Sequence, residues 1–403
     1  MKTQTSLAVA VLGATLLSGC GESSSSSAGP DFGGGNNGGT PPPTTEFNQA
    51  QLVANLADNV ISPVFASAAT AATELNGALG GYCAALQSGT DVAAAAQLAQ
   101  TQWLATMAWW QQAELMQLGP LHRDTGLRNK IYSWPVVNRC AVDQEVVLFE
   151  SGQINGQPYD ISSRTDPRKG LDALEYLLFA PSLDHRCPAS VAPANWNSRS
   201  DDDRRLARCQ FAAAAAADLV TNLNSLNSQW QSFSVDLKNA GQPGSSYGDI
   251  HDAVNDLSDG LFYLDSISKD AKLNFPLQTY ANNCDADCAN ALESGLSGSS
   301  LANVGNNLTA FRALFAGHDG IGFDDYLIEV GSNELAQQML ANLDTAIASQ
   351  TELGASLVQQ LQQTPAQVQQ LHDQTKAVTD QLKVDFINSL ALDLPPTSAG
   401  DND

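Results

Sequence analysis

Two carboxylates three residues apart are the clearest candidates for chemistry in this sequence. Asp172 and Glu175 lie within the apolar run 171–179, and residues at that spacing are neighbours on the surface of a helix. Two like charges so placed repel each other unless a cation lies between them or one carboxyl keeps its proton. Carboxylate oxygens are ligands for hard cations. The alternative is an acidic helix face that is merely solvated.

A third carboxylate, Glu114, lies on a helix face that is otherwise aromatic. Trp103, Trp110 and Glu114 recur at spacings of seven and four in a predicted helix over 91–117, so they share one face. An unpaired carboxylate in an apolar seam is costly. Glu114 should therefore be protonated, hydrogen-bonded or bound to a cation, unless this face reaches solvent near Gly119.

The segments around these carboxylates resemble the imelysin family. The stretch 170–179, with the sequence GLDALEYLLF, resembles the family motif G-x-H-x-x-E followed by Tyr-Leu-Leu. Other matching segments occur in the family's order at 110–114 (WQQAE), 118–120 (LGP), 130–135 (KIYSWP), 307–317 (NLTAFRALFAG) and 400–403 (GDND). The resemblance runs from about residue 47 to the C-terminus.

The resemblance implies a helical fold of two pseudo-repeated bundles, with the motif near their junction. The family is named for a peptidase, and many of its members are iron-regulated envelope proteins linked to iron uptake. This sequence retains Glu175 but has Asp172 where the motif has histidine. The change replaces a nitrogen ligand by oxygen, which shifts the preference from Zn²⁺ towards hard cations such as Fe³⁺ or Ca²⁺. It also argues against hydrolysis.

We therefore expect Glu114, Asp172 and Glu175 to converge in one partly buried polar cleft. Three carboxylates packed together cannot all stay ionised without compensation. A bound cation would supply it. Arg168, one turn before Asp172, is the alternative source of positive charge.

The remaining candidate features are weaker. Trp110 and Tyr176 are expected to support the cleft because they lie in the matching motifs. None of the five histidines has the H-E-x-x-H spacing of a zinc peptidase, and only His318, followed by the acidic pair 324–325, is a candidate for the site. The segment 244–248 (GSSYG) matches G-x-S-x-G by letter but follows a Pro-Gly break rather than a strand, which is typical of a linker.

Composition narrows the function classes. The chain has 403 residues, a formal net charge of −24, 43% hydrophobic and 7% aromatic residues. Such an acidic balance argues against nucleic acid as a partner and against electrostatic adhesion to anionic lipid. It is compatible with cationic partners, metal ions included.

The N-terminus carries an export signal. Lys2 precedes an apolar stretch over 7–17 that is too short to span a bilayer. The sequence Leu-Ser-Gly-Cys at 17–20 resembles the lipobox of bacterial lipoproteins. We expect residues 1–19 to be a signal peptide and Cys20 to become the lipidated first residue, and the alternative is an ordinary signal peptide.

The segment 20–46 is expected to be a tether. It is rich in Ser, Gly and Pro, a composition typical of flexible linkers. Gly21 after the lipidated residue resembles the outer-membrane sorting class, which places the protein at the outer membrane, facing the periplasm. We expect no later membrane helix, because no other segment reaches the run of ~18–20 apolar residues that one needs.

Six cysteines remain besides Cys20, and an even number in an exported protein predicts three disulfides. The pairs Cys187–Cys209 and Cys284–Cys288 close short loops, which leaves Cys83 to pair with Cys140. A zinc site is the alternative, but the sequence contains no C-x-x-C pair.

The folded part is predicted to be all-α. Apolar residues recur with a helical period, and the sequence contains no alternating strand pattern. Asp166-Pro167 and Thr364-Pro365 have the pattern of helix starts with proline in the first turn. The break at 242–244 (QPG) divides the chain into an N-terminal bundle, 47–242, and a C-terminal bundle, 243–403. Helices are expected over about 47–83, 91–117, 171–179, 200–235, 248–268, 300–315, 323–350 and 365–392.

Three function classes remain. The leading one is a non-catalytic envelope binding protein for iron or another metal, with iron-uptake components of the envelope as candidate partners. The second is a metallopeptidase of imelysin type with an altered motif, and the third is an interaction module whose cleft binds no metal.

Overall fold

The computed structural model describes residues 46–122 and 125–395. All of them belong to one compact unit of the chain, Gly39–Asp403. The predicted signal peptide (1–19), Cys20, the tether up to residue 45 and the closing motif 400–403 lie outside the described residues.

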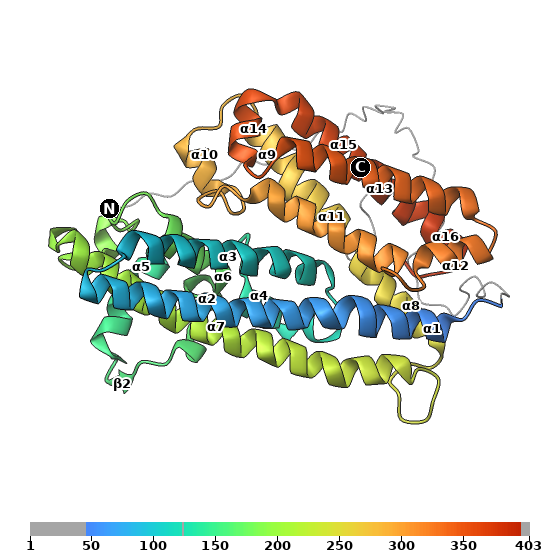
Figure 1. Ribbon diagram of the computed structural model, residues 1–403, viewed down its shortest axis with the longest axis horizontal. Coiled ribbons are helices and arrows are strands. Elements are labelled where there is room, and N and C mark those ends of the chain that lie inside the picture. Colours follow the sequence, from blue (N-terminus) through green and yellow to red (C-terminus); the bar gives the residue numbers. More distant parts are fainter. Residues whose placement is uncertain (1–45, 123–124, 396–403) are drawn as a thin grey trace, which may run out of the picture. The chain divides into compact units, whose positions relative to one another are not determined.

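The first half of this unit is a bundle of long helices (Figure 1). Apolar side chains at spacings of three and four, such as Phe65, Ala68, Ala72 and Leu75, are buried where the helices pack together. The helix α2 packs along both α3 and α7. The long elements are α1 (Gln49–Asn55), a π-helical turn (Leu56–Ile61), α2 (Ser62–Ser88), α3 (Val92–Leu115) and α7 (Asp201–Lys238).

Shorter elements fill the stretch between α3 and α7. Two strands of two residues each, β1 (Gln153–Ile154) and β2 (Gln157–Pro158), form an antiparallel hairpin and are the only strands in the described ranges. The helices here are α4 (Leu127–Ile131), α5 (Arg139–Ser151) and α6 (Gly170–Phe179), with short 3₁₀ turns at Gly119–Leu121, Ile161–Ser163, Asp166–Arg168, Ala189–Val191 and Trp196–Ser198.

The second half is a set of helices that packs against the first, chiefly through α11 on α3 (Figure 1). Its elements are α8 (Ile250–Asp259), a 3₁₀ turn (Gly260–Phe262), a π-helix (Leu264–Asn274), α9 (Phe275–Tyr280), α10 (Ala286–Ala291), α11 (Ser300–Ala316), α12 (Phe323–Glu329), α13 (Asn333–Leu353), α14 (Leu357–Gln363), α15 (Pro365–Gln381), a π-helical turn (Leu382–Phe386) and α16 (Ile387–Leu390). The break expected at 242–244 falls in the loop between α7 and α8. The division into two bundles at that point stays a prediction.

The all-α prediction is confirmed, and two local predictions were wrong. The helix expected over 323–350 is two helices, because Gly331 has a φ of +90° between α12 and α13. The pair Asp166-Pro167 does not begin α6. It forms a 3₁₀ turn, and α6 starts at Gly170, whose φ of +83° interrupts the helical path.

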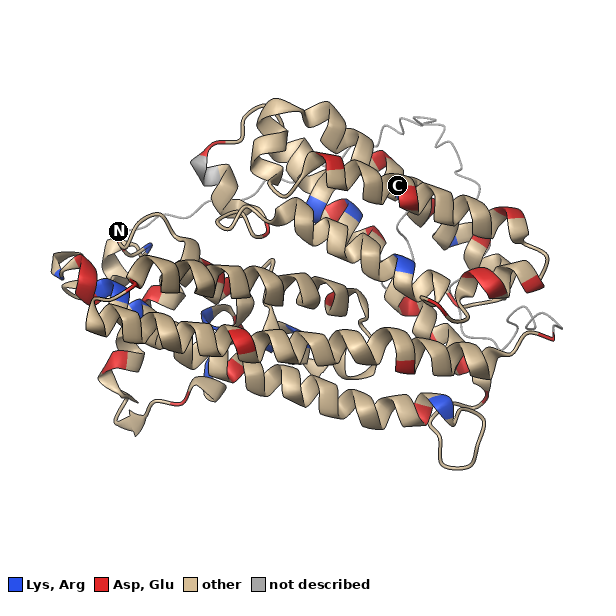
Figure 2. Ribbon diagram, in the orientation of Figure 1, with Lys and Arg blue, Asp and Glu red and all other residues tan. Residues whose placement is uncertain are grey.

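One run of helix in the described residues, Gln49–Ser88, has the length and composition of a membrane span, whereas no such segment was expected after the signal peptide. Of its most apolar window, 56% is buried inside the protein, and core helices of soluble proteins pass the same test. Charged side chains are sparse on it, and several Lys and Arg residues gather instead near α5 and α6 (Figure 2).

The disulfides correct two of the expected pairings. Cys83 bonds to Cys209, which ties α2 to α7, and Cys140 bonds to Cys187. The local bridge Cys284–Cys288 is present as expected. Loop length was a poor guide, because packing of α2 on α7 brings Cys83 to a Cα–Cα distance of 5.6 Å from a residue 126 positions away.

Candidate functional site

The site is built on the first turns of α6, and Gly170 sets where that helix begins. Its φ of +83° is in the left-handed region that favours glycine. A Cβ at this position would lie 2.7 Å from the carbonyl oxygen of Ile131. Farther along, Trp103 Nε1 donates to the carbonyl of Leu171 at 3.0 Å and fastens α6 to α3. The glycine of the motif thus lets α6 pack closely on the end of α4.

Asp172 is buried and held by one serine. The backbone N–H of Ser133 donates to Oδ1 at 3.2 Å, and the Ser133 hydroxyl donates to Oδ2 at 2.9 Å. Burial raises the pKa of Asp172 to about 7, although the Ser133 hydrogen bonds act to lower it. This carboxyl therefore keeps its proton to a higher pH than an exposed aspartate does.

Glu175 is held in the same way from another part of the chain. The backbone N–H and the hydroxyl of Ser297 both donate to Oε1, at 2.8 and 2.9 Å. Burial raises the pKa of Glu175, and the Ser297 hydrogen bonds and the positive charge of Arg139 oppose that rise.

Asp172 and Glu175 face a common cavity of about 390 Å³, here called the carboxylate cavity. Residues from both sides of the expected 242/243 boundary contribute to it. Its polar and aromatic lining comprises Tyr132, Trp134, Asn138, Arg139, Asp172, Glu175, Arg186, Asn290 and Ser294.

The absence of a cationic partner distinguishes Asp172 and Glu175 from the other buried carboxylates. Eight Asp and Glu residues are buried in the described ranges. Neither Asp172 nor Glu175 forms an ion pair there. The six that pair with Lys or Arg are Glu114, Asp143, Glu145, Asp218, Asp265 and Glu293.

Glu114 does not line the carboxylate cavity. It is fully buried in an ion pair with Arg128, and its other oxygen lies 3.7 Å from Nζ of Lys272. Lys272 also pairs with Glu293 at 3.1 Å, so two acids and two bases cancel. Tyr132, which lines the cavity, donates to Glu293 at 3.1 Å and adjoins this cluster. The structure thus brings together two of the three expected carboxylates in the cavity and places the third in a neutral cluster beside it.

Two of the expected supporting residues serve other buried acids. Arg168 donates to Glu145 at 2.9 Å and so is not the charge that compensates Asp172. The Tyr176 hydroxyl donates to Asp143 at 2.9 Å, beside Arg208.

Trp110 and His318 are not part of the cavity lining either. Trp110 is buried with its ring edge-on to Tyr132, at 6.4 Å between centroids. His318 is exposed just after α11. The other end of that helix, at Ser300, comes three residues after Ser297, and 17 residues of α-helix span about 25 Å.

The donor set fits a hydrated hard cation better than zinc. In the parts of the chain that the structure describes, no three His, Cys, Asp or Glu side chains lie close enough to hold a metal. Zinc sites use three or four protein ligands, rich in nitrogen and sulfur. Cations such as Ca²⁺ complete their coordination with water and other oxygen ligands.

Four residues of the site were not anticipated from the sequence. Ser133 and Ser297 hold the carboxylates, and Arg139 and Arg186 line the same cavity. Ser133 lies within the family-like segment 130–135, so the resemblance could have pointed to it as a site residue. Each arginine directly precedes a cysteine. The sequence does not show that these two cysteines bond to each other, so it does not show that the two arginines lie close together.

Comparisons with known proteins agree with this architecture. Residues 61–384 match the family described as Imelysin. The chain is 26% identical over 313 residues to "Iron-regulated protein A" of Synechococcus elongatus, covering 75% of this chain and 72% of that protein.

Two solved structures share the fold. One is an imelysin-like protein from Psychrobacter arcticum, with a TM-score of 0.64, 16% identity, and coverage of 87% of this chain and 99% of that one. The other is a putative iron-regulated protein A precursor from Parabacteroides distasonis, with a TM-score of 0.66, 17% identity, and coverage of 87% and 96%.

Proposed function

This chain belongs to the imelysin family, and we propose that it is a non-catalytic cell-envelope protein that binds a hard cation, iron foremost, at Asp172 and Glu175. The observation that carries the proposal is the pair of buried carboxylates without an ion pair in the described ranges. Every other buried carboxylate there has a Lys or Arg partner.

The physical argument concerns compensation of charge. Ionising a buried carboxylate that lacks a cationic partner costs several kcal/mol of folding free energy, so such a group tends to keep its proton. A cation in the carboxylate cavity would remove that cost for both groups at once. It would displace the proton from Asp172, whose pKa of about 7 makes this easy at neutral pH.

The choice of iron is supported by the comparisons and by ligand chemistry. Two relatives carry names that describe them as iron-regulated. Two carboxylates with no histidine in the cavity lining favour oxygen-seeking cations over Zn²⁺.

The cell-envelope location is supported by the lipobox-like sequence at 17–20 and by one relative that is called a precursor. Cys20→Ser should yield a soluble or unprocessed protein instead of one that fractionates with membranes. Normal membrane fractionation of Cys20→Ser would contradict lipid anchoring and would leave the cation site untouched.

The cation proposal is tested by measuring bound metal after equilibrium dialysis against Ca²⁺ alone, Zn²⁺ alone and Fe³⁺ supplied as its citrate complex. We expect about one Ca²⁺ or Fe³⁺ per chain, less Zn²⁺, and loss of that binding in Asp172→Asn with Glu175→Gln. The matched control is Glu334→Gln with Glu352→Gln, which removes two exposed carboxylates from α13. Equal metal content in wild type and in the Asp172/Glu175 variant would refute the proposal.

A further inference from the structure

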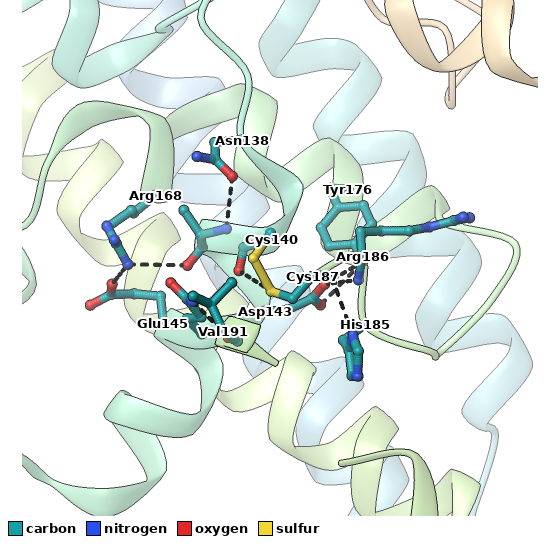
Figure 3. The surroundings of a disulfide bond; sticks show 12 residues. Asn138, Cys140, Asp143, Glu145, Arg168, Tyr176, His185, Arg186, Cys187 and Val191 are labelled. Atoms are coloured by element: carbon teal, nitrogen blue, oxygen red, sulfur yellow. Dashed lines mark hydrogen bonds and ion pairs between the residues drawn. A yellow bond between two sulfur atoms is a disulfide. The ribbon is translucent and has the colours of Figure 1, made fainter. Parts of the chain in front are cut away.

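The carboxylate cavity also holds two arginines that the proposed cation site does not use. Arg139 and Arg186 are 47 residues apart and line the same cavity. Each directly precedes a cysteine of one disulfide, Cys140–Cys187, whose Cα atoms are 4.5 Å apart (Figure 3). The disulfide therefore fixes the two arginines on neighbouring stretches of backbone.

Within the described ranges, these are also the arginines that form no ion pair with Asp or Glu. Of the ten arginines in the described ranges, eight form an ion pair with Asp or Glu. Arg139 instead donates to the carbonyl of Asn290 at 2.7 Å, and the backbone N–H of Arg186 donates to Asp143 at 2.7 Å.

The two guanidinium groups are close enough to affect each other. Burial lowers the pKa of Arg139, Glu175 opposes that effect, and the positive charge of Arg186 adds to it. Two neighbouring guanidinium groups, neither of them in an ion pair, can together bind an anion through charge-assisted hydrogen bonds.

One cavity thus contains both the buried carboxylates and the arginines that form no ion pair in the described ranges, although the charges of Arg139 and Glu175 act on each other's pKa. Ser133 and Ser297 hold the two acids, and Asn290 holds Arg139. Opposite charges that share a cavity yet stay out of contact leave room for a ligand that carries both signs.

We propose that Arg139 and Arg186 bind the anionic part of the ligand, so that the cavity takes the cation as a complex with a small oxyanion or polycarboxylate. This inference rests on the proposed cation site and names the form in which the cation arrives. Oxygen atoms of the anion would supply the ligands that the two carboxylates of the protein do not provide, while the guanidinium groups bind its remaining oxygens.

Size and local charge are consistent with such a ligand. A volume of 390 Å³ corresponds to about thirteen water-sized groups at about 30 Å³ each, which is the size of a small chelate. The chain as a whole has a net charge of −24 and would repel anions. The segment 123–208, which carries both arginines, contains twelve acidic and twelve basic residues and is neutral.

The experiment compares titrations of Ca²⁺ alone, citrate alone and Fe³⁺–citrate by calorimetry. The variant is Arg139→Gln with Arg186→Gln. The matched control is Arg205→Gln with Arg312→Gln, whose side chains are 48% and 46% exposed in surface ion pairs. We expect the Arg139/Arg186 variant to lose at least tenfold in affinity for Fe³⁺–citrate. Its affinity for Ca²⁺ alone should stay the same or rise, because two repelling charges are gone.

These opposite changes in affinity separate anion binding from a structural role, since a distorted cavity would bind both Ca²⁺ and Fe³⁺–citrate more weakly. Equal losses for Ca²⁺ and Fe³⁺–citrate, or no loss for either, would overturn the inference and leave the cation proposal standing. Tight binding of citrate alone that is unaffected by Asp172→Asn with Glu175→Gln would also overturn it, because the anion would then not be bound with a cation. Failure of Ca²⁺ and Fe³⁺–citrate alike to bind the wild type would refute the proposed function itself.

The disulfide gives a second test of the same inference. The variant Cys140→Ser with Cys187→Ser removes the bond that fixes the two arginines near each other. We expect it to lower the affinity for Fe³⁺–citrate more than the affinity for Ca²⁺. The control is Cys284→Ser with Cys288→Ser, which also removes one bridge. Equal effects of the two cysteine variants on both ligands would contradict a role for Cys140–Cys187 in placing the arginines.

Discussion

Ser297 donates two hydrogen bonds to a single oxygen of Glu175, from its backbone N–H at 2.8 Å and from its hydroxyl at 2.9 Å, across 122 residues of sequence. The contact joins α6 to the segment that leads into α11. The geometry of the carboxylate cavity therefore depends on how the two halves of the described chain pack.

Ser297→Ala should destabilise the protein by about 1–2 kcal/mol at pH 8, because a buried carboxylate loses one donor. Urea unfolding measures the change, and the difference from wild type should shrink at low pH, where Glu175 is protonated. Ser151→Ala, which removes an exposed hydroxyl that donates to two backbone carbonyls, is the control and should have a smaller effect. A loss that is the same at both pH values would contradict this account.

Gly170→Ala should destabilise the protein and abolish cation binding. The new Cβ would meet the Ile131 carbonyl at 2.7 Å, and the φ of +83° is unfavourable for alanine. Gly77→Ala is the matched control, because Gly77 lies inside α2 with nothing within 4 Å of a Cβ. The unfolding free energy of this control should rise by about 0.5–1 kcal/mol, because alanine favours the helical conformation more than glycine does. Thermal melts that shift in the same direction for both variants would contradict the assigned role of Gly170.

Stability without a cation should depend on pH through Asp172. Its folded-state pKa of about 7 exceeds the ordinary aspartate value of 3.8, so between these values the folded state binds more protons than the unfolded state. The contribution of Asp172 to the unfolding free energy is therefore full below pH 4 and is lost as pH rises through 7. The unfolding free energy of Asp172→Asn, measured relative to that of the wild type, should rise by about 4 kcal/mol between pH 4 and pH 8, at about 1.4 kcal/mol per pKa unit. A difference between the two proteins that does not vary with pH would contradict the raised pKa.

Cation affinity should rise with pH for the same reason. A cation that displaces one proton from Asp172 binds up to about tenfold more tightly per pH unit below 7, and the dependence flattens above it. Calorimetric titration of Ca²⁺ at pH 6, 7 and 8 measures the slope. Affinity that falls over this range would show that Asp172 is not a ligand.

The oxidised protein should contain no free thiol among the six cysteines from Cys83 to Cys288, and its bridges should be Cys83–Cys209, Cys140–Cys187 and Cys284–Cys288. Mass spectrometry of a non-reduced digest identifies the linked peptides. A peptide that joins Cys83 to Cys140 would contradict the packing of α2 on α7.

We expect no zinc-dependent peptidase activity on a denatured protein substrate. A catalytic zinc normally uses three protein ligands and an activated water, and the cavity offers two carboxylates. Asp172→His restores the family's motif and is the informative comparison. Turnover by the wild type that disappears in Glu175→Gln would reinstate a metallopeptidase.

Local patterns in the sequence determined the secondary structure and part of the site. Apolar residues at helical spacing predict α2, α3, α7 and α11, because that period depends only on neighbours along the chain. The spacing of Asp172 and Glu175 places them on one face of α6 by the same logic. The break at Gly331 was missed because nothing in the apolar pattern around it signals a positive φ.

The composition of the site was decided by tertiary structure. Glu114 pairs with Arg128, whereas Asp172 and Glu175 form no ion pair in the described ranges. This difference depends on residues that meet only after the helices have packed. The cysteine pairing has the same origin, and with it the placement of Arg139 beside Arg186. Sequence periodicity reports the face of one helix, whereas compensation of a buried charge requires partners from several elements, and their approach is set by the packing of the whole unit.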